Sequence, residues 1–115
     1  MILGEPGALR VAETIRVGAS ISTINLAEVI AKLIDRGFSG DEAITAAGFE
    51  RLRVVEFSDQ LAVESGLLRA ITRSKGLSLG DRCCLATAIG LGEDVLTADR
   101  NWADIDLGVM IELCR

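Results

Sequence analysis

Apolar residues recur along this chain in two patterns, one with the spacing of a helix and one with the compactness of a buried strand. Helical spacing predicts helices at about residues 6–17, 25–36, 39–50, 58–75 and 81–91. Short runs of β-branched and other apolar residues predict strands at 19–23, 52–57, 95–97 and 109–114. Strands that alternate with helices are typical of a parallel α/β sheet covered by helices on both faces, so we expect a single α/β domain over residues 1–115.

The prediction of a functional site depends most on the segment from Leu77 to Asp99. It reads as one helix that begins near Asp81 and ends at Gly92, followed by the buried strand Val95–Thr97. A chain that runs along a helix and returns along a strand brings Asp81 and Asp99 to the same end. In an open parallel sheet this end, the carboxyl edge of the strands, is where ligands bind.

A third acid, Glu28, follows an earlier strand and is expected in the first turn of the next helix, where Asn25 can form the cap. Each acid also has a purely structural explanation. Glu28 could complement the helix dipole, Asp81 could be only an N-cap, and Asp99 could belong to a turn. Their common position at one sheet edge favours a shared site.

Three carboxylates at one site require compensation. Two carboxylates about 5 Å apart repel by roughly 3 kcal/mol at an effective dielectric constant near 20. The cluster must therefore bind metal, hold a proton, or lie beside cations such as Arg82 and Arg100. Oxygen ligands suit Mg²⁺ or Mn²⁺, and the matching chemistry is phosphodiester hydrolysis by metal-activated water.

Composition excludes several other functions. The 115 residues include no histidine, which rules out serine–histidine catalysis and histidine-containing zinc sites. The three cysteines show no C-x-x-C spacing and are expected to be small buried apolar residues. A net charge of −5 argues against broad electrostatic binding of nucleic acid, although scattered arginines could form a local basic rim. No apolar run is long enough to span a membrane, and we expect a cytoplasmic protein.

Three segments of the chain resemble the PIN domain, specifically the VapC-type toxins of bacterial toxin–antitoxin pairs. They are STINLAEV (22–29), LSLGDRCCLATA (77–88) and VLTADRNW (95–102), and the ending LGVMIELC is also similar. The resemblance implies an α/β/α sandwich and an Mg²⁺- or Mn²⁺-dependent endoribonuclease. It also implies an RNA substrate, a homodimer and inhibition by a cognate antitoxin.

Carried over by residue, the resemblance places Glu28, Asp81 and Asp99 on the metal-binding acids of the family. Thr97 matches the hydroxyl position before the last acid, and Ser22 lies near the site. We expect these two hydroxyls to contact substrate, together with the cations Arg82 and Arg100.

The chain departs from the family at its start. Family members begin with a strand that ends in Asp, and here Met1 stands after the position of that strand. We therefore expect a three-layer sandwich whose first, central strand and first metal-binding Asp are missing, the simplest reason being a misplaced start codon. The alternative function is a catalytically silent truncated module that dimerises and binds an antitoxin. A phospho-acceptor domain of receiver type is a third, weaker possibility, because it requires an acid pair and a lysine that are not evident.

Overall fold

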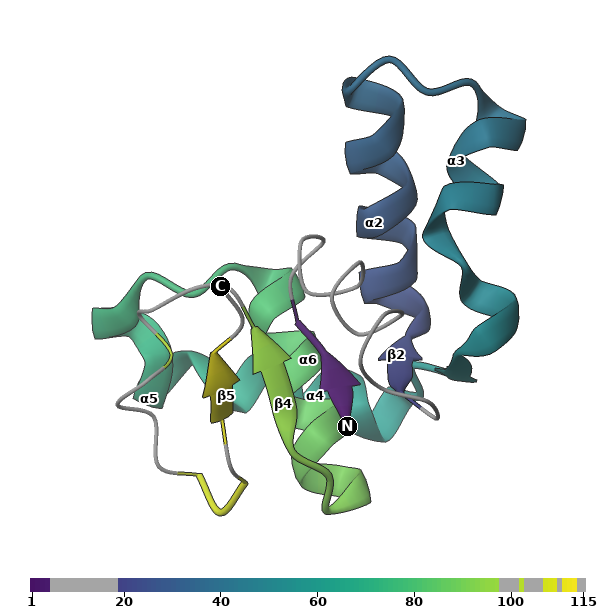
Figure 1. The fold of residues 1–115 in the computed structure, drawn as a ribbon. Helices are drawn as coiled ribbons and strands as arrows, with labels where there is room; N and C mark the ends of the chain where they lie inside the picture. Colours follow the sequence, from purple (N-terminus) through teal and green to yellow (C-terminus); the bar gives the residue numbers. More distant parts are fainter. Residues whose placement is uncertain (5–18, 98–101, 103–106, 110, 114–115) are drawn as a thin grey trace.

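The computed structural model describes residues 1–4, 19–97, 102, 107–109 and 111–113. In this part of the chain five strands form one parallel sheet in the order β3-β2-β1-β4-β5 (Figure 1). The strands are β1 (Ile2–Leu3), β2 (Ser20–Ser22), β3 (Arg53–Val55), β4 (Val95–Thr97) and β5 (Ile111–Leu113). The predicted α/β class with a parallel sheet is confirmed, and the arrangement is that of a three-layer α/β/α sandwich.

The centre of the sheet corrects one prediction. We expected the central strand to be missing, but Ile2 pairs with Ser20 on one side and with Val95 on the other. The backbone N–H of Ile2 donates to the carbonyl of Asp94 at 2.7 Å, and the N–H of Ser20 donates to the carbonyl of Met1 at 2.7 Å. The two-residue strand β1 is therefore enough to join β2 to β4. Without it, the facing backbone groups of β2 and β4 would lack hydrogen-bond partners.

Five helices accompany the sheet in the described residues, and each of the longer ones begins at a serine. They are α2 (Thr23–Asp35), α3 (Gly40–Ala47), α4 (Asp59–Leu67), α5 (Arg69–Thr72) and α6 (Leu79–Leu91). The hydroxyls of Ser22, Ser39, Ser58 and Ser78 accept the backbone N–H three residues later. This bond satisfies one of the free N–H groups at a helix start.

Two helix predictions require correction. α2 begins at Thr23 and not at Asn25, because the cap is the hydroxyl of Ser22. The single helix expected over 58–75 is divided into α4, α5 and a 3-10 turn at Arg73–Lys75. The division falls at Leu68, two residues after Gly66, and glycine is unfavourable in the interior of a helix. The helix expected over 6–17 lies outside the described residues.

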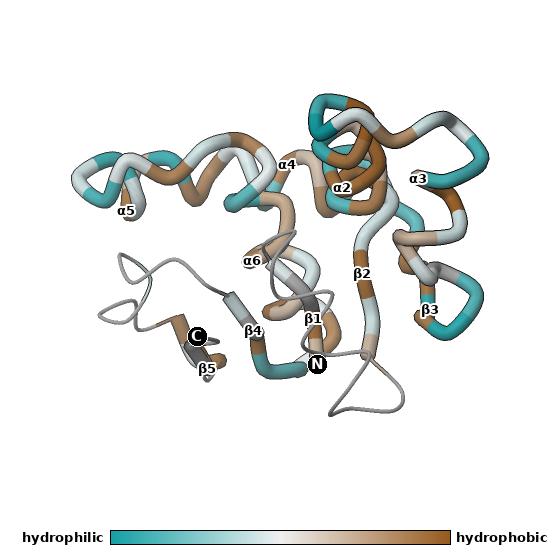
Figure 2. The backbone as a smooth tube through the Cα atoms, turned by 45° about the horizontal axis from the view of Figure 1, so that its top comes forward, coloured by the Kyte–Doolittle hydropathy of each residue, from teal (hydrophilic) through white to brown (hydrophobic). Residues whose placement is uncertain are grey.

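The core consists of two clusters of buried residues, one of which includes Ile2 of β1. One joins Ile21 to residues of α2 and α3, and these two helices project together away from the sheet (Figure 1). The other joins Ile2, Val95 and Trp102 to one face of α6. Figure 2 shows hydrophobic and hydrophilic residues following one another along α4 and α5, and several of the apolar side chains there are exposed. No helix in the described ranges is long and apolar enough to cross a membrane.

Candidate functional site

Two helix starts meet at the carboxyl edge of the sheet. Ser22 ends β2 and caps α2, and Thr97 ends β4, so both fully buried hydroxyl residues lie at this edge. α6 precedes β4 in the chain and packs on β1, β2 and β4. Its first residues therefore lie at the same edge as the start of α2.

Asn25 joins the two helix starts. This residue is 3% exposed, and its amide nitrogen donates to the carbonyl of Gly80 at 2.9 Å and to Oε1 of Glu28 at 3.1 Å. Its amide oxygen accepts from the hydroxyl of Ser22 at 2.6 Å, and its backbone N–H donates to the same hydroxyl at 3.1 Å. Both donors of the amide group are thus used, which fixes its orientation.

The carboxylate of Glu28 lies directly against Gly80, the residue before Asp81. A Cβ atom placed on Gly80 would overlap the carboxylate oxygens of Glu28. Glu28 itself is exposed, and it lies beyond the first turn of α2, which contains no acid. This position corrects the first-turn prediction and removes the helix-dipole explanation, since the dipole effect falls off within the first turn.

Asp81 is the third residue of α6 and part of a capping box. Its Oδ2 accepts the backbone N–H of Ser78 at 3.0 Å, and its own N–H donates to the hydroxyl of Ser78 at 3.3 Å. Ser78 is therefore the N-cap, and Asp81 is not. A carboxylate has two oxygens, so capping through Oδ2 is compatible with a further contact through Oδ1.

Arg82 and Cys83 turn toward α4. A guanidinium nitrogen of Arg82 donates to the carbonyl of Ser65 at 3.4 Å, and its buried Nε has no hydrogen-bond partner among the described residues. Burial raises the pKa of the Cys83 thiol, opposed by a hydrogen bond from Ser65 and supported by the negative charge of Glu28. Cys83 is thus a neutral buried residue, as is the buried Cys84, while Cys114 lies outside the described residues.

The carboxylates of Glu28 and Asp81 are the type of ligand that a hard divalent cation such as Mg²⁺ prefers. Glu28 on α2 and Asp81 on α6 carry carboxylate oxygens, and the side chain of Asn25 connects the two helices. Asp99 and Arg100 lie outside the described residues. Within the described ranges no group of three acids, cysteines or histidines is close enough to hold a metal ion.

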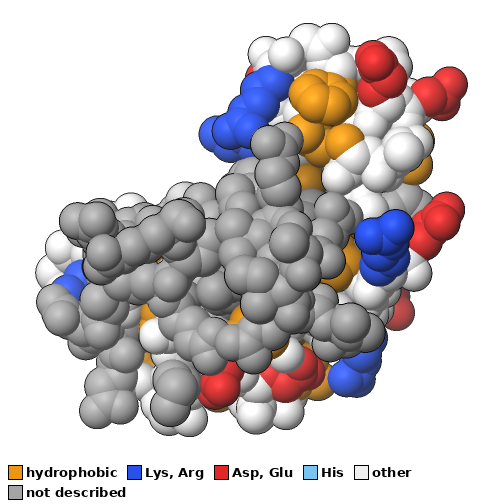
Figure 3. Space-filling model, viewed as in Figure 1, with side chains coloured by type: hydrophobic (Ala, Val, Ile, Leu, Met, Phe, Trp, Pro, Cys, Tyr) orange, Lys and Arg blue, Asp and Glu red, His pale blue; other side chains and the backbone are white. Residues whose placement is uncertain are grey.

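The exposed arginines do not form one rim. Arg53 begins β3 at one edge of the sheet and Arg51 lies just before it, whereas Arg69 and Arg73 lie on and after α5 at the other end of the molecule (Figure 2). On the face in Figure 3 the visible lysine and arginine side chains are likewise separated. The described cations therefore do not suggest a continuous path for a polyanion.

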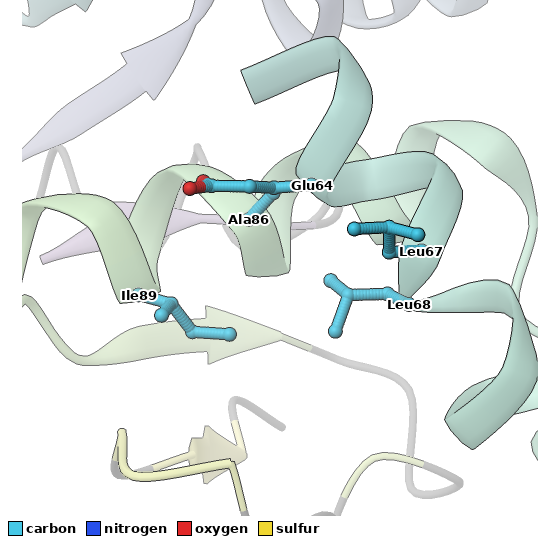
Figure 4. A pocket seen from close by; sticks show the side chains of 5 residues that line it. All are labelled: Glu64, Leu67, Leu68, Ala86 and Ile89. Atoms are coloured by element: carbon cyan, nitrogen blue, oxygen red, sulfur yellow. The ribbon is translucent and has the colours of Figure 1, made fainter. Parts of the chain in front are cut away.

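An apolar hollow of about 270 Å³ lies between α4 and α6. Figure 4 shows Leu67 of α4 and Leu68, the next residue, near Ala86 and Ile89 of α6, with Glu64 at one end. Leu67 is 70% exposed, and Val63 and Ile71, four residues away on either side, are each 61% exposed. These three exposed apolar side chains lie on α4 and α5.

Two residues of the site, Asn25 and Gly80, were not recognised as such from the sequence. The three-residue spacing of Asn25 and Glu28 places them on one face of a helix and was a usable signal. The contact of Asn25 with Gly80 joins residues 55 positions apart, and no local pattern predicts it.

The fold is an open parallel α/β sheet, a class of protein that binds ligands at the carboxyl edge of its strands, and Glu28 and Asp81 lie on α2 and α6, the helices that begin there. The model of the PIN domain family matches residues 1–107, and the chain belongs to this family. The predicted resemblance to PIN domains is therefore confirmed.

Solved structures with the same fold come from toxin–antitoxin complexes. A chain of VapBC2 from Rickettsia felis, bound to a promoter DNA fragment, has a TM-score of 0.75 and 18% identity and covers 99% of this chain and 98% of its own. A chain of DNA-bound VapBC from Salmonella typhimurium has a TM-score of 0.72 and 22% identity, and the match covers 97% of this chain and 96% of that chain. A chain of VapBC-5 from Mycobacterium tuberculosis has a TM-score of 0.68 and 14% identity, and the match covers 98% of this chain and 97% of that chain. No curated protein matches the chain in sequence.

Proposed function

We propose that this chain is a metal-dependent endoribonuclease that acts as the toxin of a toxin–antitoxin pair in the cytoplasm. The observation that carries the proposal is the contact of the Glu28 carboxylate with Gly80, which brings one acid beside the start of the helix that holds Asp81. Membership of the PIN family and the likeness to chains of VapBC complexes support the same function.

In this proposal Glu28, Asp81 and Asp99 hold Mg²⁺ or Mn²⁺. The chemistry that such a cation supplies is activation of water and screening of the phosphate charge. The chain itself would contribute the oxygen ligands, with the Glu28 carboxylate oriented by a hydrogen bond from Asn25 and the Asp81 carboxylate by its capping box. Arg82, Arg100 and the hydroxyls of Ser22 and Thr97 are proposed near the substrate; since both hydroxyls are buried, we expect them to act mainly by holding the edge of the sheet.

Titration of metal against RNA cleavage tests this function. The chain is stripped with EDTA and incubated with a single-stranded RNA of mixed sequence at increasing Mn²⁺ or Mg²⁺. We expect no cleavage without metal and saturable cleavage with it. Cleavage that persists in EDTA would contradict the proposal.

The alternative is a silent module that dimerises and binds an antitoxin. It is favoured by one observation, because the residue directly after β1 is Gly4 and not the aspartate with which the first strand ends in the family that the chain resembles. A folded chain that gives no cleavage at saturating Mn²⁺ would support this alternative.

We further propose a homodimer that buries the apolar stripe of Val63, Leu67 and Ile71. Three exposed apolar side chains on the consecutive helices α4 and α5 are typical of an interaction surface, and a two-fold axis would cover them in both copies. We expect Leu67→Glu to lower the mass measured by light scattering from twice 12.2 kDa to 12.2 kDa. Ile44→Glu, which changes an exposed residue of α3, is the control and should leave the dimer intact. A natural chain that is monomeric at micromolar concentration would contradict the dimer.

A further inference from the structure

The start of α2 differs from the other two helix starts that have a polar third residue. In α3 and α6 the third residue is an acid, Glu42 or Asp81, which accepts the backbone N–H of the capping serine. In α2 the third residue is Asn25, and its side chain bonds to the hydroxyl of Ser22. The amide nitrogen of Asn25 is thereby directed out of its own helix.

An acid at position 25 could not make the same contacts. The two acceptors of the Asn25 amide are the Gly80 carbonyl and the Glu28 carboxylate, and a carboxylate cannot donate to either of them. The Gly80 carbonyl belongs to the first turn of α6, one residue before Asp81. The buried side chain of Asn25 thus contacts both Glu28 and the backbone next to Asp81.

Gly80 completes this arrangement through its missing side chain. It lies in a helix with ordinary helical backbone angles, where glycine is less favourable than alanine, so its backbone conformation does not require glycine. The feature that a Cβ atom would meet is the carboxylate of Glu28. Glycine at this position therefore serves the approach of Glu28 to α6.

We infer that Asn25 and Gly80 are positioning residues that set the distance between the carboxylates of Glu28 and Asp81. This inference rests on the proposed metal site. Asn25 holds Glu28 and α6 together, and Gly80 leaves the space that the Glu28 carboxylate occupies. Neither residue supplies a metal ligand itself.

Gly80→Ala is the sharpest test, because it separates position from stability. The Glu28 carboxylate is the mobile end of an exposed side chain and can move aside, while alanine favours the helix. We expect the melting temperature of this variant to be unchanged or raised. Its affinity for Mn²⁺, measured by calorimetry on EDTA-stripped protein, should fall about 10–100-fold, as for outer partners of metal ligands.

Gly40→Ala is the matched control. Gly40 also lies in the first turn of a helix with a capping box, and no atom lies within 4 Å of the place of its Cβ. We expect it to bind Mn²⁺ as the natural chain does. Asn25→Ala, which removes the amide, should weaken Mn²⁺ binding in the same range as Gly80→Ala.

Three results would overturn the inference. The first is unchanged Mn²⁺ affinity in both Gly80→Ala and Asn25→Ala. The second is loss of cooperative unfolding in Gly80→Ala, since the inference requires that Glu28 moves at little cost. The third is a natural chain that binds no Mn²⁺, which would also remove the proposed function, whereas the first two would leave that function in place.

Discussion

Asp81→Asn is expected to lower metal-dependent RNA cleavage by more than about 100-fold, because even outer-shell partners of metal ligands contribute about 10–100-fold. The substitution removes the negative charge that a divalent cation requires and keeps the shape of the side chain. Its amide oxygen can still accept the N–H of Ser78, the bond that Asp81 makes at 3.0 Å. The variant should therefore remain folded, and the loss should appear in the cleavage rate at saturating Mn²⁺.

Glu42→Gln is the matched control for this prediction. Glu42 holds the same place in the capping box of α3, where its Oε1 accepts the N–H of Ser39 at 2.8 Å. The backbone and hydroxyl of Ser39 lower the pKa of Glu42, so its contribution to stability is present above pH 4.5 and is lost as the pH falls. Cleavage should be the same in Glu42→Gln as in the natural chain. Equal cleavage by Asp81→Asn would show that Asp81 acts only as a capping residue.

The sequence predicts well those elements that depend on residues close together in the chain. The strand Val95–Thr97 and the capping box of Ser39 and Glu42 are found as expected, since both depend on residues a few positions apart. The predicted helix over 58–75 is instead divided at Leu68, two residues after Gly66, and glycine is unfavourable in the interior of a helix.

The candidate site is predictable to a lesser degree. The sequence places Glu28 and Asp81 at one edge of the sheet, and the structure brings the first against the residue before the second. The buried amide between them cannot be deduced from spacing, because Asn25 also has an ordinary explanation as a helix cap. The role of each acid stays a prediction, and Asp99 lies outside the described residues.

Ile2→Ala is expected to lower the free energy of unfolding by about 2–5 kcal/mol, the range for an isoleucine truncated in a core. Ile2 is 0% exposed and packs in the cluster that contains Val95 and Trp102. β1 has only two residues, so few other side chains can hold it between β2 and β4. Urea unfolding measures the change, which should shift the midpoint at a constant slope.

The consequence of this prediction reaches the site. β1 is the only strand that joins β2 to β4 in the described sheet, and these two strands end at Ser22 and Thr97. Ile44→Ala, at a residue 47% exposed, should change stability by no more than about 0.5 kcal/mol and serves as the control. A loss below about 1 kcal/mol for Ile2→Ala would be far below the core range and would contradict a central β1. A loss in the expected range would indicate that the two-residue strand β1 holds β2 and β4 together. Glu28 and Asp81 lie on α2 and α6, the helices that begin at the carboxyl edge of these strands.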